Sequence, residues 1–552
     1  MSLVTFIKSM LHEINPWHNF KLLNSNIRSD ITAGITVGII ALPLALAFGE
    51  VSQLGPVAGI WGAIIGGVIG GLFGGSIVSV SGPTAPTSSQ IATFMAAFII
   101  GATNQPDLTA IFSIIFLSGL IIVGISILNI SKFIHYIPYS VVAGFMCGIG
   151  VIVILGQIST FFGMGSNFSI SKVNADVLFV SLPSLFIMLF WPKIRTINKI
   201  FNNIPAPLST LIFGTLIAYF MNLDIVYIGN QMKSAAQNDL LNIYFPDFTR
   251  FFEFLYPALT LAGLVTIDSL LTCKIADNMI GGHHKSNQEV FGQGLANMVA
   301  GLCGGVSIAT ATMFTVSNIK FGGKTPLASI IYGLTLLSIL FGLKFLVEFI
   351  PIACISAILL KVGIDIMDYR VLPILRKLPI SDIIIFIIVL IITVFGDLMI
   401  AVAIGVLLSI IKNFKDFRLK YKHEIFHISK SSFNLKIKNK ETLKSLPISI
   451  LEPKGSLFFG SIQSLLNLFK LNMKNDLLII DMSHVNEIDL TSAYALEDFI
   501  NLLNGKNIKV SLVNTNSNIN IFLEKIRFKE RFDINNDKKS LESQIITKYK
   551  LD

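Results

Sequence analysis

Charged residues are scarce in this sequence. Only 14% of its 552 residues are Asp, Glu, Lys or Arg, whereas 53% are hydrophobic, and the mean hydropathy is +0.72. This composition excludes a soluble protein of the ordinary kind. The uncharged run 51–106 is long enough for two membrane crossings of about 20 residues each. We therefore interpret the chain as an integral membrane protein.

Cysteine is also rare, and so are the motifs of enzymes. The four cysteines lie in apolar segments without the spacing of metal ligands, which indicates small packed residues. In the less apolar C-terminal part, no nucleophile–base pair, metal-ligand cluster or phosphate-binding loop stands out from chance, so we expect neither an enzyme nor a bound cofactor. Residues 1–28 lack the apolar core of a cleavable signal.

The lysines and arginines of the loops are unevenly distributed. When the N-terminus is placed in the cytoplasm, most of them fall in cytoplasmic loops, and the opposite loops hold few: Lys172, Lys233, Arg250 and Lys344. This is the positive-inside pattern. It predicts an even number of spans, about fourteen, with both termini cytoplasmic in the plasma (inner) membrane. The net charge of +9 then reflects topology, and no nucleic-acid partner is expected.

The composition changes after residue 411. A basic stretch at 412–420 suits the surface of a membrane, and further on apolar runs alternate with amphipathic stretches, as in a small α/β domain. We expect a cytoplasmic N-terminal segment (1–28), an all-α transmembrane domain (29–411), a basic linker (412–446) and a cytoplasmic α/β domain (447–552).

The motif Gly-Leu-x-Gly-Gly occurs twice, at 71–75 and 301–305. A break in the apolar pattern follows each copy, Ser-Gly-Pro-Thr-Ala-Pro at 81–86 and Ser-Ile-Ala-Thr-Ala-Thr at 307–312. An odd number of spans, about seven, separates the copies, which predicts an inverted 7+7 repeat. Paired broken segments of this kind line substrate sites near the middle of the membrane. Close helix packing is the alternative explanation of the glycines, but it does not explain the two prolines.

The two breaks predict an anion site. Prolines at 83 and 86 prevent a continuous helix yet suit the first turn of a new one, so we expect half-helices that begin near Ala85 and near 310–312. Each N-terminus carries roughly half a positive charge, and together they supply about one without a cationic side chain. The candidate anion-binding residues are Pro83, Thr84, Ala85, Ala311 and Thr312.

Asp268 is the only charged residue between Glu253 and Lys274. An uncompensated charge inside the membrane costs roughly 3 kcal/mol or more, so it requires a partner. Thr272 lies four residues later on the same helical face, and the two oxygens suit a hard cation such as sodium. The alternative is an Asp268 that pairs with Lys274 or Lys285 at the cytoplasmic rim. One carboxylate, one sodium and one monovalent anion sum to −1, which the two helix ends would neutralise.

Four runs of residues carry a family resemblance. Asp-Met-Ser-His-Val-Asn-Glu-Ile-Asp-Leu-Thr-Ser at 481–492 resembles the strand–loop–helix signature of STAS domains. Arg-Ser-Asp-Ile-Thr-Ala-Gly at 28–34, Ala-Leu-Pro at 41–43 and Ser-Gly-Pro-Thr at 81–84 are similar to the first and third spans of the SulP family of inorganic anion transporters. That family joins a multispanning domain to a C-terminal STAS domain. The resemblance implies a homodimer and a scaffold or regulatory role for the STAS domain.

Within that family, three further runs resemble BicA-type sodium-dependent bicarbonate transporters: Ala-Thr-Met at 311–313, Gly-Lys-Thr at 323–325 and Lys-Val-Gly-Ile-Asp at 361–365. This resemblance implies that Asp268 and Thr272 bind sodium, with Thr312 and the backbone at Thr310 and Ala311 completing the set. Many exchangers of the family carry Arg where this chain has Phe314, which favours bicarbonate over sulfate. Phe314 either forms an apolar wall of the cavity or faces the lipid.

We therefore expect a secondary transporter that moves bicarbonate with sodium by elevator-like alternating access. Three alternatives remain open at this point. The chain could transport sulfate or another anion as a proton-coupled carrier or an exchanger. It could instead conduct anions like a channel or act as a voltage-sensitive motor, as some relatives of the family do. It could also be a membrane-anchored signalling scaffold.

Overall fold

The chain folds into two compact units. They comprise Met1–Ile134, Met146–Met367 and Thr393–Met399, and His135–Phe145, Asp368–Ile392 and Ile400–Asp552. The structure is a computed structural model, and it describes residues 14–100, 105–129, 138–164, 173–197, 206–229, 243–280, 284–342, 348–367, 378–396, 398–412, 424–427, 447–458, 476–505, 508–513, 515–525 and 534–535.

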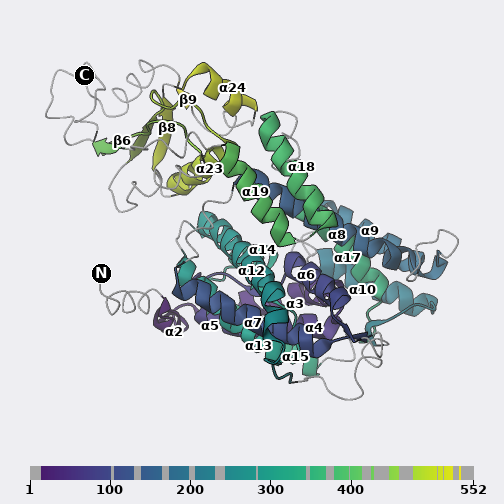
Figure 1. Ribbon diagram of the computed structural model, residues 1–552. Coiled ribbons are helices and arrows are strands. Elements are labelled where there is room, and N and C mark those ends of the chain that lie inside the picture. The colour runs from purple at the N-terminus through teal and green to yellow at the C-terminus, as the bar shows by residue number, and fades with distance from the viewer. Residues whose placement is uncertain are drawn as a thin grey trace, which may run out of the picture. The chain divides into compact units, whose positions relative to one another are not determined.

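Apolar helices of membrane-spanning length confirm that this is a membrane protein (Figure 1). Among the described residues, five are long and apolar enough to cross a membrane: Ile27–Val51, Pro56–Phe73, Leu108–Ile127, Tyr139–Phe162 and Phe251–Asp277. Shorter apolar helices of 10–17 residues lie at Ala175–Trp191, Ala206–Met221, Pro326–Gly342, Ile380–Phe395 and Ile400–Lys412. The count of fourteen spans stays a prediction.

Most of the elements around the two breaks are helices. They are α3 (Ile27–Val51), α4 (Pro56–Ile65), η1 (Gly66–Gly70), α5 (Gly71–Phe73), β1 (Ser81–Pro83), α6 (Ala85–Ala97), α7 (Leu108–Ile127), α12 (Phe251–Ile280), α13 (Ser286–Leu302), β4 (Ile308–Thr310), α14 (Thr312–Lys320) and α15 (Pro326–Gly342). The other elements up to residue 412 are α2 (Trp17–Leu22), β2 (Ile99–Ile100), β3 (Gln105–Pro106), α8 (Tyr139–Phe162), α9 (Ala175–Ile197), α10 (Ala206–Met221), α17 (Ile352–Ile366), α18 (Ile380–Phe395) and α19 (Leu398–Lys412).

Short strands replace helix at both breaks. β1 pairs antiparallel with β4, so that Ser81 lies opposite Thr310 and Pro83 opposite Ile308. All residues of both strands are buried. Each strand leads directly into a half-helix, because Thr84 and Ala311 are the N-cap residues of α6 and α14. The two breaks thus satisfy each other's backbone groups, as irregular backbone inside a membrane requires.

The two Gly-Leu-x-Gly-Gly copies pack in a reciprocal way. The helix that leads into the second copy, α13, contacts the end of the first, where the Lys285 N–H donates to the Gly75 carbonyl (3.1 Å). The helix that leads into the first copy, α4, contacts the end of the second, where the Val306 N–H donates to the Ala58 carbonyl (3.0 Å). Glycine is required at these contacts, since a Cβ on Gly75 would lie 2.1 Å from the Lys285 carbonyl oxygen. Antiparallel pairing with exchanged contacts is the arrangement of an inverted repeat.

The second unit contains a five-stranded sheet in the order β5-β6-β7-β8-β9. Its strands are β5 (Glu424–His427), β6 (Ile448–Glu452), β7 (Leu477–Asp481), β8 (Lys509–Val513) and β9 (Ile534–Asn535), with α23 (Leu490–Gly505) and α24 (Ser517–Lys525) as helices (Figure 1). β5 pairs antiparallel and the other strands parallel, which confirms the α/β class. β5 falls within the segment 412–446 expected to be a linker, because a four-residue strand between polar residues carries little periodic signal.

Candidate functional site

The helix α12 contacts both half-helices through two polar side chains. Asp268 and Thr272 lie one turn apart on it, as predicted from their spacing. The Thr84 hydroxyl donates to Asp268 Oδ2 (2.7 Å), and the hydroxyls of Thr272 and Thr312 share a hydrogen bond (2.7 Å). α12 therefore connects the N-cap of α6 to the first residue of α14.

Asp268 has no cationic partner in the described part of the chain. It is half-buried, and it accepts a hydrogen bond from the Thr84 hydroxyl. The structure describes both Lys274 and Lys285, and neither forms an ion pair with it. The alternative in which one of these lysines neutralises Asp268 at the rim is therefore not what the structure shows.

The N-terminus of α6 is already capped by the protein. Thr84 and Thr87 form a capping box, in which the Thr84 side chain accepts the Thr87 N–H and the Thr84 N–H donates to Thr87 Oγ1. The proline at 86 has no N–H to offer. Of the first-turn donors, only the N–H of Ala85 lacks a partner among the described residues.

The N-terminus of α14 is open by comparison. Its N-cap is Ala311, whose side chain cannot accept a hydrogen bond. Within the described residues, the N–H groups of Thr312, Met313 and Phe314 have no partner, and the first regular bond is from the Thr315 N–H to the Ala311 carbonyl (2.9 Å). From the sequence, the two helix ends were predicted to contribute equally. In the structure α14 supplies most of the free donors, because alanine cannot form the cap that threonine forms.

The other predicted site residues are held in place by hydrogen bonds of their backbone or by burial in the paired strands. The Thr310 N–H donates to Ser269 Oγ (3.0 Å), and the Ala311 N–H donates to the Val80 carbonyl (3.0 Å). The hydroxyl of Thr310 donates to Glu289 Oε1. Pro83 is a buried residue of β1. The assignment of the backbone at Thr310 and Ala311 to the cation stays a prediction.

Phe314 does not face the lipid. It is only 1% exposed, and its ring centroid lies 5.7 Å from that of Tyr332 on α15. Both side chains press on β1, because a Cβ on Gly82 would lie 2.9 Å from each of them. Of the two alternatives, the lipid-facing one is therefore wrong.

Four polar residues near the site were missed from the sequence. They are Ser269, Glu289, Gln293 and Asn297. The last three recur every fourth residue along α13, and a polar stripe in an otherwise apolar span was the available signal. Asn297 shows their role, since its side chain accepts the Ile308 N–H (3.0 Å) and donates to the Ile308 carbonyl (2.8 Å).

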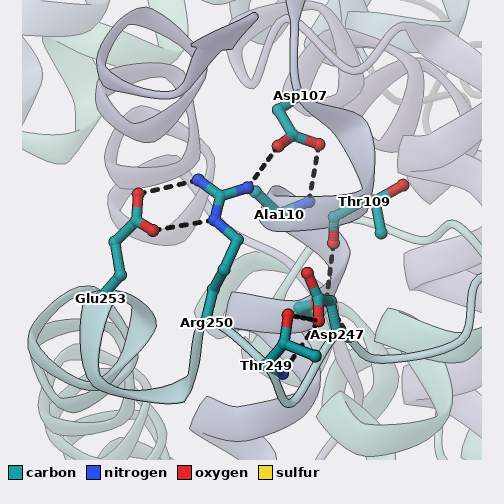
Figure 2. Close-up of polar contacts among 8 residues, drawn as sticks. Asp107, Thr109, Ala110, Asp247, Thr249, Arg250 and Glu253 are labelled. Carbon is teal, nitrogen blue, oxygen red and sulfur yellow. Dashed lines mark hydrogen bonds and ion pairs between the residues drawn. The ribbon is translucent and has the colours of Figure 1, made fainter.

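A charged cluster fixes the start of α12. Figure 2 shows the Arg250 guanidinium between the carboxylates of Asp107 and Glu253, at 2.7 and 2.8 Å. Hydrogen bonds to Glu253 and Asp107 raise the pKa of Arg250 above its usual range. The Thr249 hydroxyl and N–H lower the pKa of Asp247. The cluster ties α12 to the start of α7, so the helix that carries Asp268 is anchored at one end.

A helical membrane domain with two paired broken helices, followed by a small α/β domain, defines a membrane transporter. The comparison with known families is more specific. The profile described as "Sulfate permease family" matches residues 27–389, and the profile described as "STAS domain" matches residues 422–541. The chain belongs to the sulfate permease (SulP) family of anion transporters and carries a C-terminal STAS domain.

Curated relatives are similar over almost the whole chain. The bicarbonate transporter BicA of Picosynechococcus sp. is 29% identical over 92% of this chain and 92% of its own length. BicA of Synechocystis sp. is 30% identical over 91% of both chains. A putative sulfate transporter of Bacillus subtilis is 28% identical over 89% of this chain and 92% of its own. Relatives of both names therefore match, and they confirm the resemblance stated above.

Solved structures show the same fold. The transmembrane domain of a cyanobacterial BicA aligns with a TM-score of 0.60 at 33% identity, covering 68% of this chain and 97% of that structure. SLC26A9 aligns with a TM-score of 0.65 at 17% identity, covering 100% of this chain and 96% of that structure. The chain is a transporter and not an enzyme.

Proposed function

We propose that this anion transporter takes up bicarbonate together with sodium by elevator-like alternating access. The observation that carries the proposal is the position of α12. Its Asp268 accepts a hydrogen bond from the N-cap of α6 (2.7 Å), and its Thr272 contacts the first residue of α14 (2.7 Å). A carboxylate that forms no ion pair within the described residues thus lies beside two helix N-termini of the membrane domain.

Sodium suits the oxygens of this site. A half-buried carboxylate and the hydroxyls of Thr272 and Thr312 are hard ligands of the kind that such a cation prefers. In this proposal sodium is a transported ion and not a resident cofactor. Its charge would compensate Asp268, which the described lysines leave unpaired.

The anion would bind chiefly at α14. Three free N–H groups and the positive end of the helix dipole favour a small anion there. No arginine stands at the position of Phe314, and on this proposal the helix ends and sodium supply the positive charge. That limited charge favours a monovalent anion, and the two BicA relatives are named as bicarbonate transporters.

In the movement that we propose, the two half-helices and the ions bound between them move together as one rigid body. β1 and β4 are hydrogen-bonded to each other, so the two half-helix starts would travel together past the rest of the membrane domain. We further propose that the protein lies in the plasma (inner) membrane with both termini cytoplasmic, as its loop charges indicate. Resemblance to the family supports a homodimer.

The test is uptake of radiolabelled bicarbonate and sulfate into proteoliposomes under imposed sodium or proton gradients. We expect sodium-driven bicarbonate uptake by the unmodified protein. Asp268→Asn should abolish the sodium-driven component, because it removes the charge that holds the cation while keeping the shape of the side chain.

Asp365→Asn is the matched control. Asp365 pairs with Lys361 on α17, a helix to which the proposal assigns no ion-binding residue, and its substitution should leave uptake unchanged. Full sodium-dependent uptake by a well-folded Asp268→Asn protein would contradict the assignment of the cation site. Uptake driven by a proton gradient would show that protons are the coupling ion. Uptake of sulfate in place of bicarbonate would show that sulfate is the transported anion.

A sulfate transporter is the second candidate, because the Bacillus subtilis relative is named as one. The same assay separates the two candidates, since both anions are offered in parallel. Anion flux that no cation gradient drives would instead indicate a channel-like protein.

A further inference from the structure

The first turn of α13 contains a buried carboxylate that the proposed ion site does not use. Glu289 is 1% exposed. Its Oε2 accepts the N–H groups of Gly75 (2.7 Å) and Ser76 (3.0 Å). Its Oε1 accepts the Gln293 amide (3.0 Å) and the Thr310 hydroxyl. Each oxygen thus receives two donors, and all four partners are neutral.

Three of these partners lie at the two breaks of the inverted repeat, and the fourth, Gln293, lies one turn further along α13. Gly75 and Ser76 follow α5 on the way to β1, whereas Thr310 is the last residue of β4. Gln293 extends the link, because its amide also lies within hydrogen-bond distance of Ser81 Oγ (2.6 Å) and Thr310 Oγ1 (2.9 Å). Ser81 and Thr310 are the residues that face each other in the β1–β4 pair. One carboxylate therefore connects the approach to the first break with the paired strands.

The glycines of the first repeat copy make this contact possible. A Cβ on Gly75 would lie 2.6 Å from the Glu289 nitrogen, and a Cβ on Gly74 would lie 3.0 Å from Glu289 Oε2. Any other residue would push α13 away and move the carboxylate from the backbone donors. The sequence motif and the buried acid therefore belong to one arrangement.

Thr310 is fixed from two sides by these contacts. Its hydroxyl is held by Glu289 and its N–H by Ser269, so little freedom remains for its peptide groups. The next peptide leads into Ala311 and the open N-terminus of α14. A shift of Thr310 would therefore move the free N–H groups of α14 relative to Asp268.

We propose that Glu289 is a positioning residue, which holds Thr310 and the two breaks in the geometry that gives the site its affinity for sodium. The inference rests on the proposed function, because it assumes that sodium binds at Asp268. Glu289 touches neither ion; it acts through Thr310 and through the backbone of residues 75–76.

The experiment uses the purified full-length protein with Glu289→Gln. Two quantities are measured: the sodium concentration that gives half of the maximal thermal stabilisation, and amide hydrogen exchange of the segments 74–84 and 306–312. We expect the half-maximal sodium concentration to rise about tenfold or more, as the loss of charge-assisted hydrogen bonds implies. Exchange should become faster in both segments.

Asp30→Asn is the matched control. Asp30 is another buried carboxylate with neutral donors, the N–H groups of Lys324 and Thr325 and the Thr325 hydroxyl (2.7, 3.2 and 2.6 Å). Its loss should loosen the start of α15 and leave the sodium dependence unchanged. A general loss of stability would affect both variants alike, whereas a positioning role affects only Glu289→Gln.

A second pair of variants keeps the test informative if Glu289→Gln does not fold. Thr310→Val removes the hydroxyl that Glu289 holds, and Thr310→Ser keeps it. We expect a raised sodium requirement in Thr310→Val and recovery in Thr310→Ser. Equal behaviour of the two, or unchanged exchange in both segments of Glu289→Gln, would overturn the inference. If the unmodified protein shows no sodium effect, the proposed function fails, and the exchange measurement alone decides the role of Glu289.

Discussion

At the scale of single residues, Gly82 lies between the side chains of Phe314 and Tyr332 and has no room for a methyl group. A Cβ there would lie 2.9 Å from the Phe314 ring and 2.9 Å from the Tyr332 hydroxyl oxygen. That hydroxyl is fully buried and has no hydrogen-bond partner among the described residues. β1 therefore packs closely against this aromatic pair at Gly82.

Gly82→Ala should therefore lower the free energy of unfolding by about 1–3 kcal/mol, as overpacking does. Tyr332→Phe alone should be neutral or slightly stabilising, because it removes a buried polar atom that bonds to nothing. The double variant should recover part of the loss, and unfolding of the four proteins in detergent measures this. An effect of Gly82→Ala that Tyr332→Phe does not reduce would show that the hydroxyl is not the obstacle.

Candidate site residues can be predicted from the sequence when their residue type is unusual for the segment that contains them. Asp268 is a charge in an apolar span, and the prolines at 83 and 86 interrupt a helix, so both features can be recognised from the sequence alone. The role of Tyr332 cannot be recognised in this way, because a tyrosine in an apolar helix is common. Its contact with Gly82, about 250 residues away along the chain, arises only from tertiary packing.

At the scale of elements, the position of α12 depends on its anchored start. Arg250 precedes the helix and binds Asp107 at the start of α7 as well as Glu253 (Figure 2). The Arg250 side chain also lies over the ring of Phe254 at 4.9 Å. These contacts hold two helices together at one end, where their side chains are partly exposed.

Arg250→Met should lower the free energy of unfolding by about 1 kcal/mol, since partly exposed ion pairs are screened by solvent. The difference from the unmodified protein should shrink in about 1 M salt. Lys361→Met is the control, because Lys361 pairs with Asp365 four residues later on the same helix. Thermal unfolding at low and high salt measures both, and equal losses would contradict a role for Arg250 in joining the helices.

The positions of the half-helices at the two breaks could be predicted from the sequence. The hydrogen bonding at their N-termini could be predicted only in part. The starts of α6 and α14 were predicted within a residue or two, because proline and the N-cap positions mark them. The difference between the two N-termini was not predicted. It depends on Thr84 turning its side chain onto its own helix, which spacing alone does not reveal.

At the scale of the whole molecule, the predicted site lies within one of the two compact units. Thr84, Asp268, Thr272, Thr310 and Thr312 all belong to Met1–Ile134 or Met146–Met367. The STAS sheet belongs to the other unit. The family assignment, the membrane class and the α/β class of the C-terminal part could all be read from sequence, because each depends on long segments rather than on single contacts.

A chain that ends after Lys420 should therefore keep its sodium-dependent thermal stabilisation. The measurement is made on monodisperse protein beside the full chain, with Asp268→Asn introduced into both as the negative control. Loss of the effect in a folded truncated protein would favour the scaffold alternative, in which the C-terminal domain is required for all activity.

During biosynthesis, the first break enters the membrane long before its partner exists. Glu289 follows Ser76 by 213 residues, a delay of roughly 10 to 40 seconds at ordinary rates of translation. Until then the N–H groups of Gly75 and Ser76 lack their carboxylate, and unpaired backbone groups in lipid cost several kcal/mol each. The nascent chain must keep this segment in contact with water or the insertion machinery until α13 emerges. The same dependence would allow two separately translated halves to complete each other.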